Sequence, residues 1–208
     1  MQVDVVEAVG AVVRRVEARE RDGQPVRVVV ASRAYDTGID DLWQALTDPE
    51  RIPRWFAPVT GDLRLGGRYQ IEGNAGGTVT ACDPPRRLAL TWEFGPQTTW
   101  VSVELAADGE GRTRLTLEHM APIDPHWGQF GAGAVGVGWD LSILGLALYL
   151  AGGMGGPEAG MAWAGSDEGK AFIRGSAEGW GDAETAMGED AATAQERVQA
   201  TAKFYTGG

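Results

Sequence analysis

His119 is the residue whose type and position best suit chemistry in this 208-residue chain. In the segment TRLTLEH, residues 113–119, Leu115, Leu117 and His119 alternate with polar residues, which predicts a strand with the imidazole on its apolar face. An inward imidazole can act as a general base or orient a ligand, and the pattern also fits a neutral core histidine with one hydrogen bond to a tyrosine or a backbone carbonyl. No paired carboxylates and no nucleophile–base couple share that face, so we assign no catalytic residue.

Metal and thiol chemistry find little support in the sequence. Asp124, His126 and Glu118 invite a metal site, but the Asp-x-His spacing is too short for a helical pair and no further ligand is evident. Cys82 is the only cysteine, which excludes an internal disulfide and a multi-cysteine zinc site. We therefore expect no metal and no cofactor.

Charge and hydropathy limit the partners. The chain has 18 basic and 29 acidic residues, a formal net charge of −11, which disfavours nucleic acids and anionic membrane surfaces. The N-terminal residues lack the basic and apolar regions of a signal peptide. The strongest apolar run, residues 141–150, is half as long as the ~20 residues that span a bilayer. We expect a cytoplasmic protein that binds neither nucleic acid nor membrane.

Between residues 62 and 120, short segments of alternating polarity are separated by turn residues. The pattern predicts strands over 62–65, 68–72, 78–83, 88–94, 98–105 and 113–120, after an earlier strand over 26–35. The separators, Gly66-Gly67 and Gly95-Pro96 among them, are too short for parallel crossovers, so these strands should form an antiparallel meander. Alternation gives the sheet one apolar face, which helices must cover.

Three segments have helical spacing and can supply that cover. Residues 38–47 predict a helix whose apolar residues form one stripe. Residues 49–56 predict a second, short helix that begins with a proline at a first-turn position. Residues 135–151 predict a long apolar helix whose stripe is Trp139, Ile143, Leu146 and Leu150. The glycines at the start of this helix are expected to let it approach the sheet or to let the entry loop move.

The two ends of the chain differ from this central part. Residues 1–24 predict an N-terminal extension of a helix that runs into a strand. Residues 152–160 have the composition of a flexible glycine-rich linker, and residues 161–208 predict a helical hairpin. The hairpin has a narrow apolar seam, Ile173, Ala177, Trp180 and Met187, that should pack on the rest of the chain because isolated helices of this length are marginal in water.

Four segments together resemble the SRPBCC superfamily, also called START or birch-pollen-allergen-like. They are DLWQALTDPERIPRWFAP (41–58), DLRLGGRY (62–69), CDPPRRLALTWEF (82–94) and TRLTLEH (113–119), and they look most like the branch named for the activator of the heat-shock protein 90 ATPase. The resemblance implies an α+β helix-grip fold over residues 25–151, a curved antiparallel β-sheet wrapped around a long C-terminal helix. The α-helical C-terminal extension and the N-terminal segment look like additions found in a subgroup of bacterial members.

The resemblance and the alternation together predict a cavity between the sheet and the long helix. Trp55 and Phe56 occupy the place where the family closes the gap between its small helices and the sheet. Trp100 alternates outward, so we expect it to pack under the tail or the N-terminal segment. The expected lining is Trp55, Phe56, Tyr69, Leu90, Trp92, Val103, Leu117, His119, Trp139, Ile143 and Leu146.

Fold alone does not choose a function, because the superfamily holds small-molecule carriers, aromatase-cyclases and co-chaperone domains. The leading hypothesis is binding of a small hydrophobic or aromatic ligand in the cavity. The second is a chaperone-linked or other protein-interaction module with a packed interior. The third is a cyclase or hydrolase that uses His119 or a nearby tyrosine or glutamate. Monomer and homodimer both remain open.

Overall fold

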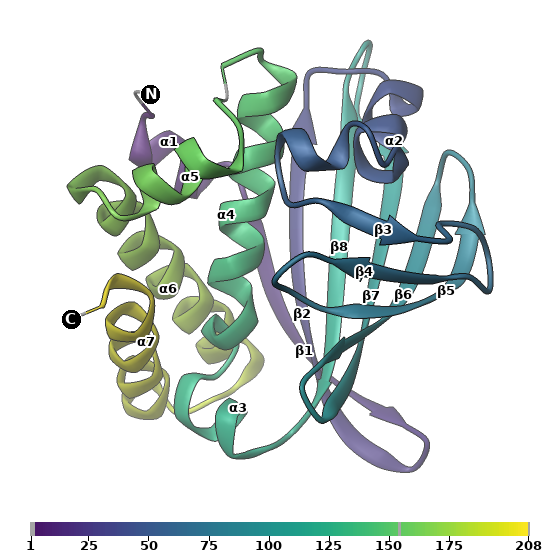
Figure 1. Ribbon diagram of the computed structural model, residues 1–208. Helices are drawn as coiled ribbons and strands as arrows, with labels where there is room; N and C mark the ends of the chain where they lie inside the picture. The colour runs from purple at the N-terminus through teal and green to yellow at the C-terminus, as the bar shows by residue number, and fades with distance from the viewer. Residues whose placement is uncertain (1–2, 154, 208) are drawn as a thin grey trace.

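One antiparallel sheet forms the framework of the protein. The computed structural model describes residues 3–153 and 155–207. The strands follow one another across the sheet in the order β1-β2-β8-β7-β6-β5-β4-β3, and the sheet curves so that β3 and β4 cross in front of it (Figure 1). The bounds are Val13–Arg21 (β1), Gln24–Tyr35 (β2), Val59–Gly61 (β3), Arg68–Ile71 (β4), Gly76–Asp83 (β5), Arg87–Phe94 (β6), Gln97–Ala107 (β7) and Thr113–Pro122 (β8).

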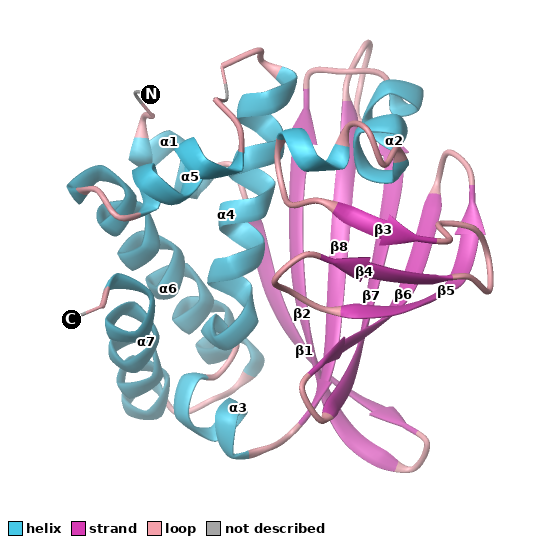
Figure 2. Cartoon of the chain, viewed as in Figure 1, coloured by secondary structure: helices cyan, strands magenta, loops and turns pink. Residues whose placement is uncertain are grey.

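The helices gather on one side of the sheet, except for α2, which lies over the end of its concave face (Figure 2). Asp4, Asp124, Ser166 and Asp190 cap the starts of α1, α3, α6 and α7 through their side-chain oxygens. This arrangement confirms the α+β helix-grip fold. The bounds are Val5–Gly10 (α1), Ile39–Thr47 (α2), Pro125–Phe130 (α3), Gly133–Leu150 (α4), Pro157–Ala164 (α5), Asp167–Met187 (α6) and Ala191–Thr206 (α7).

Helix α4 lies between two layers, with the sheet on one side and α6 and α7 on the other (Figure 1). Its 18 residues have a mean hydropathy of 1.5, so length and composition alone would let it cross a membrane. In the fold it is a core helix: Ile143 and Leu146 pack in the main core, whereas Leu144 packs in a second cluster with Trp163 of α5 and Phe172 of α6. An apolar helix surrounded by protein explains this composition without a membrane.

The charge in the middle of α4 is paired inside the protein. Asp140 is fully buried and its Oδ2 accepts from Arg14 Nε of β1 at 2.8 Å. The same oxygen accepts from Ser176 Oγ at 2.5 Å and from Trp180 Nε1 at 3.1 Å, both on α6. Burial raises the pKa of Asp140, and these three donors act in the opposite direction. The network therefore joins the N-terminal segment, the central helix and the tail.

Two expected elements around residue 60 are wrong. Residues 62–65 form no strand: the short strand is β3, and residues 62–67 turn back toward β4, with Asp62 N donating to Arg68 O at 2.8 Å. Leu63 and Leu65 alternate as in a strand, but the positive φ of Gly61 and Gly66 ends the extended backbone on both sides. The helix expected over 49–56 is only a 3-10 turn at Ile52–Arg54, in which Pro53 lacks the N–H that a longer helix would use.

Two expectations about glycine-rich segments also need correction. The linker expected over 152–160 is shorter, because α5 begins at Pro157. Gly133 and Gly136, near the start of α4, do not face the sheet. A Cβ at Gly133 would lie 2.8 Å from Thr201 of α7, and one at Gly136 would overlap the indole of Trp180. Their small size therefore lets the tail helices, not the sheet, approach α4.

Candidate functional site

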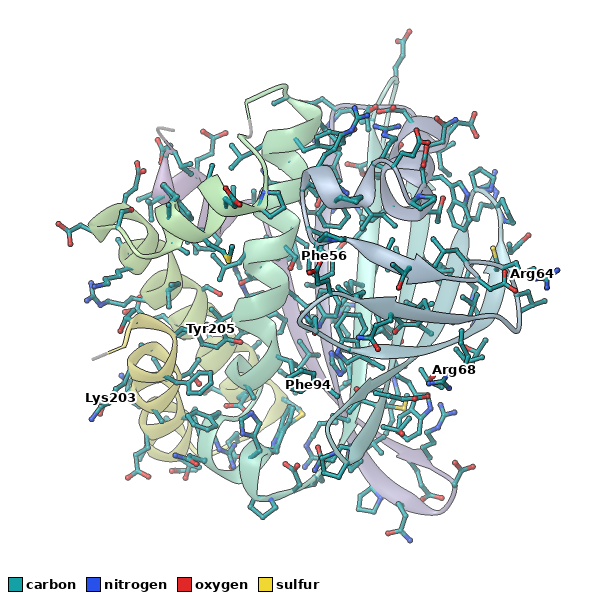
Figure 3. All side chains as sticks on the ribbon, viewed as in Figure 1. Phe56, Arg64, Arg68, Phe94, Lys203 and Tyr205 are labelled. Carbon is teal, nitrogen blue, oxygen red and sulfur yellow. The ribbon has the colours of Figure 1, made fainter. Side chains whose placement is uncertain are left out.

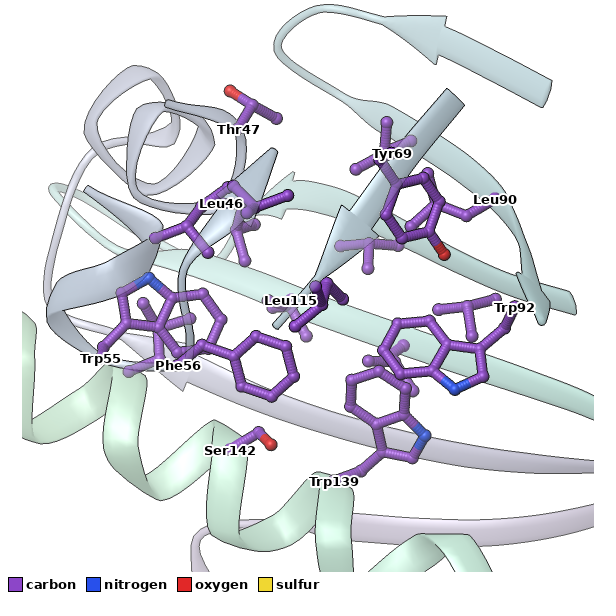
Figure 4. A pocket seen from close by; sticks show the side chains of 18 of the residues that line it. Leu46, Thr47, Trp55, Phe56, Tyr69, Leu90, Trp92, Leu115, Trp139 and Ser142 are labelled. Atoms are coloured by element: carbon purple, nitrogen blue, oxygen red, sulfur yellow. The ribbon is translucent and has the colours of Figure 1, made fainter. Parts of the chain in front are cut away.

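An apolar cavity of about 140 Å³, here called the inner cavity, lies where the sheet, α4, α2 and the β3–β4 arm (residues 59–71) meet. Trp55 and Phe56 close one end, Trp92 and Trp139 face them from the other, and Leu115 forms part of the sheet wall (Figure 4). Trp55 and Phe56 are stacked with ring centroids 5.4 Å apart, whereas Trp92 and Trp139 are tilted by 58° with centroids 5.1 Å apart. The cavity thus has an aromatic wall at each end.

The structure places all the residues expected in the lining at this cavity, except His119. These are Trp55, Phe56, Tyr69, Leu90, Trp92, Val103, Leu117, Trp139, Ile143 and Leu146. Strand alternation and helical spacing converge on one space because the apolar face of the sheet and the stripe of α4 bury each other.

Other lining residues were not anticipated. Leu88, Val101 and Leu115 lie on the same alternating faces as the expected strand residues, so the pattern could have found them. The β3–β4 arm folds over the sheet through contacts that no local pattern reveals, and this brings in residues that alternation along the meander does not reach. The remaining additions are Leu46, Thr47, Ile52, Val59, Leu63, Ile71, Val79 and Ser142.

The inner lining offers almost no free hydrogen-bonding group. Tyr69 Oη donates to Thr91 O at 2.7 Å, and Ser142 Oγ donates to Gly138 O at 2.8 Å. Trp55 Nε1 donates to Ala45 O at 2.9 Å. Burial also raises the pKa of Tyr69, so its hydroxyl stays protonated at neutral pH. The cavity can therefore hold an apolar group through dispersion and shape, with little polar recognition.

His119 lies behind Trp139 and borders a second, larger cavity of about 450 Å³. Trp139 Nε1 donates to His119 Nδ1 at 2.9 Å, and His119 Nε2 lies 2.8 Å from Thr99 Oγ1. Thr99 Oγ1 in turn lies 3.1 Å from Trp92 O, to which it donates. An indole nitrogen can only donate, so Nδ1 is the acceptor and the proton of the neutral ring sits on Nε2.

This chain of hydrogen bonds uses both nitrogens of His119. Burial lowers its pKa to about 4, because a charged imidazolium would lose its solvation. His119 therefore holds Trp139 in place and is not free to act as a general base in this arrangement. Strand alternation correctly placed His119 on the apolar face of the sheet, but Trp139 lies between His119 and the inner cavity.

The buried, neutral state of His119 predicts a pH-dependent stability. An unfolded chain has an ordinary histidine pKa of 6.5, so between pH 6.5 and about 4 it binds more protons than the folded protein. Stability should fall as the pH falls through this window, by about 3 kcal/mol in total for this group. Urea melts of the wild type and of His119→Gln across pH 4–7 measure it, and NMR titration gives the pKa directly. Equal pH slopes for both proteins would contradict it.

The residues considered for a metal serve other contacts. Asp124 Oδ1 caps α3 by accepting from Trp127 N at 2.8 Å, His126 packs against Phe130 in a tilted arrangement, and Glu118 pairs with Arg19 at 2.7 Å. Within residues 3–153 and 155–207, no group of three or more His, Cys, Asp or Glu side chains is close enough to hold a metal. Trp100 faces away from the cavity, and the Arg21 guanidinium of β1 lies over its ring, 4.0 Å from the ring centroid.

Several solved structures are similar to this chain. The crystal structure of CalU16 from Micromonospora echinospora is 33% identical, covers 78% of this chain and 98% of its own, and has a TM-score of 0.62. The solution structure of CalU16 is 29% identical, covers 85% of this chain and 97% of its own, and has a TM-score of 0.71. DynU16, from the dynemicin biosynthetic locus, is 25% identical over 61% of this chain and 48% of its own, with a TM-score of 0.52.

A family match covers the part of the chain that forms most of the cavity. No match was found among curated proteins. Residues 36–151, which run from the end of β2 through α4, match the family described as Activator of Hsp90 ATPase homolog 1-like protein. This match spans more than half of the 208 residues, and the alignment with CalU16 extends beyond it. The chain therefore belongs to the family of Activator of Hsp90 ATPase homolog 1-like proteins.

Proposed function

We propose that this protein binds a small apolar or aromatic molecule and seats a ring of it in the inner cavity. The observation that carries the proposal is the lining itself: aromatic and aliphatic side chains surround about 140 Å³, and the polar groups of Tyr69, Ser142 and Trp55 already bond to the backbone. An engineered cavity of about 150 Å³ with a similar lining stays dry and binds benzene. The space therefore suits one six-membered ring.

The alternatives find less support. A protein-interaction module was expected to have a packed interior, and the space of about 140 Å³ among these side chains argues against it. The family is named for an activator of the Hsp90 ATPase, which keeps a protein partner as the second candidate. A biosynthetic setting such as that of DynU16 supports a small-molecule ligand. For an enzyme, His119 would have to give up the hydrogen bonds that occupy both of its nitrogens.

Filling the inner cavity should remove binding without removing stability. Ile143 lines the space from α4, and the Ile143→Trp indole can occupy the volume that a ligand ring would take. We expect the fluorescent dye N-phenyl-1-naphthylamine to bind the wild type and to bind Ile143→Trp at least about tenfold more weakly, a loss of about 1.4 kcal/mol. The melting temperature of this variant should stay near that of the wild type.

The neighbouring position provides the control. Leu144 lies on the same helix but packs against α5 and α6 in a closed cluster. Leu144→Trp should therefore overpack that cluster, lower stability by about 1–3 kcal/mol and leave dye binding unchanged. No dye binding by the wild type, together with a large loss of stability in Ile143→Trp, would exclude the ligand proposal and favour the interaction module.

A further inference from the structure

The second cavity adjoins the first. It has a volume of about 450 Å³ and lies between the ends of β6, β7 and β8, the α3–α4 segment and α7. Phe56, Trp92, Trp139 and Ser142 line both cavities, so side chains and not backbone separate them. The rest of the outer lining is Asn74, Phe94, Gln97, Thr99, His119, Ala121, Pro122, Asp124, His126, Trp127, Ala134, Val135, Gly138, Phe204 and Tyr205.

Size suggests that the two cavities act together. The inner space alone holds about one ring, whereas cavities that hold a whole small ligand have volumes of about 300–1,000 Å³. The outer space is the larger of the two, and the tilted Trp92–Trp139 pair lines both. A ligand with a ring in the inner cavity would therefore place its remaining part in the outer one.

The outer cavity differs from the inner one in chemistry. Gln97, Asn74 and His126 are exposed to solvent. Within the described part of the chain, Gln97 Oε1, Asn74 Nδ2, the His126 ring nitrogens and Trp92 Nε1 take part in no hydrogen bond with the protein. The indole nitrogens of Trp92 and Trp139 lie on the side of their rings away from Trp55 and Phe56 (Figure 4). The outer cavity and its border with the inner cavity therefore offer both hydrogen-bond donors and acceptors.

The charge in the outer cavity is negative. Its described lining contains no lysine or arginine, and Asp124 supplies a carboxylate whose Oδ2 accepts from Gln97 Nε2 at 2.6 Å. Hydrogen bonds from Trp127 N and Gln97 help to keep the pKa of Asp124 below its usual value, so the group is ionised at neutral pH. The chain as a whole carries a net charge of −11. An anionic ligand group would be repelled here.

Helix α7 provides one wall of this cavity, and it lies outside the residues that match the family. Tyr205 Oη donates to Ala134 O of α4 at 3.1 Å, which holds the helix against the cavity. Tyr205 points toward α4, whereas Lys203 projects from the opposite side of α7 (Figure 3). Phe204 also borders the cavity and is 63% exposed. The tail is thus placed to influence what the protein binds.

We propose that the outer cavity is the second compartment of one ligand site, which takes a hydrogen-bonding end without negative charge, such as a hydroxyl, on a ligand whose apolar ring lies in the inner cavity. Helix α7 forms part of this compartment through Phe204 and Tyr205. The inference rests on the proposed function, because the ring must first be seated in the inner cavity. It adds the class of ligand, an elongated aromatic molecule with a neutral polar end.

A matched pair of probes tests the chemistry. Biphenyl-4-methanol and biphenyl-4-carboxylate share a two-ring body and differ in the end that would enter the outer cavity. In competition with N-phenyl-1-naphthylamine at pH 7.5, the alcohol should bind at least about tenfold more tightly than the carboxylate. Asp124→Asn keeps an N-cap residue for α3 and removes the charge, so it should reduce this preference severalfold by strengthening the binding of the carboxylate. Equal affinities for both probes in both proteins would overturn the proposal.

A second comparison tests the wall formed by α7. Phe204→Ala should weaken biphenyl-4-methanol severalfold and leave toluene, which needs only the inner cavity, unchanged. Lys203→Ala is the matched control on the other side of the helix and should change neither. If toluene binds and Ile143→Trp abolishes its binding, but Phe204→Ala and Asp124→Asn leave the biphenyl probes unaffected, the outer compartment is wrong and the proposed function stands. If toluene and both biphenyls fail to bind, the proposed function fails as well.

Discussion

Replacing Asp140 with alanine should lower the free energy of unfolding by about 3–5 kcal/mol. The substitution removes the acceptor for Arg14, Ser176 and Trp180 at once. The Arg14 side chain is only 7% exposed, so its charge would remain buried without its carboxylate partner. An uncompensated buried charge is the largest part of the expected cost. Urea denaturation at pH 7 measures it.

Two further variants separate burial from ion pairing. Asp36 pairs with Arg112 at 3.0 Å at a site where the Asp36 side chain is 90% exposed, so Asp36→Ala should have little effect, because exposed pairs contribute at most about 1 kcal/mol. The double variant Arg14→Met with Asp140→Leu should be more stable than Asp140→Ala, because it removes both buried charges. Equal, small losses for Asp140→Ala and Asp36→Ala would show that Asp140 has no special role in joining the layers.

The sequence could predict the meander and the long helix because their signals are local. Leu90 and Trp92 on β6, and Ile143 and Leu146 on α4, follow periods of two and about 3.6 residues that a single segment displays. These periods state which face a residue occupies, and ten of the lining residues followed from them or from the family resemblance. The periods do not show whether a side chain from another element lies between a residue and the cavity. Trp139 of α4 lies there, so the expected place of His119 in the inner cavity was wrong.

Features that depend on distant parts of the chain could not be predicted. Asp140 is a lone carboxylate in an apolar segment, and its partner Arg14 lies 126 positions earlier, so no spacing links the two. The glycines of α4 carried a signal for close approach, but only the packing of α6 shows that the approaching group is Trp180. The free groups of the outer cavity come from β4–β5, β6, β7 and α3, which meet only in the folded protein.

Trp180→Ala should destabilise the protein by about 3–5 kcal/mol, as the truncation of a buried tryptophan does. Trp180 is 1% exposed and packs over Gly136, on the side of α4 away from the ligand cavity. It also donates to Asp140 at 3.1 Å. We therefore expect a large fall in the melting temperature with no change in the affinity for N-phenyl-1-naphthylamine. Weaker dye binding in this variant, measured under conditions where it remains folded, would contradict the separation of the two sides of α4.

The contact between Trp180 and Gly136 predicts that two damaging substitutions should partly compensate each other. Gly136→Leu alone places a side chain where the indole of Trp180 lies, so it should destabilise the protein by about 1–3 kcal/mol or more. In the Trp180→Ala background the same leucine enters the space that the indole has left, and it should raise stability instead. Gly128→Leu is the control, because nothing lies within 4 Å of a Cβ at this glycine of α3, and its effect should be the same in both backgrounds. Strict additivity of Gly136→Leu and Trp180→Ala would mean that the tail does not pack on α4 through this contact.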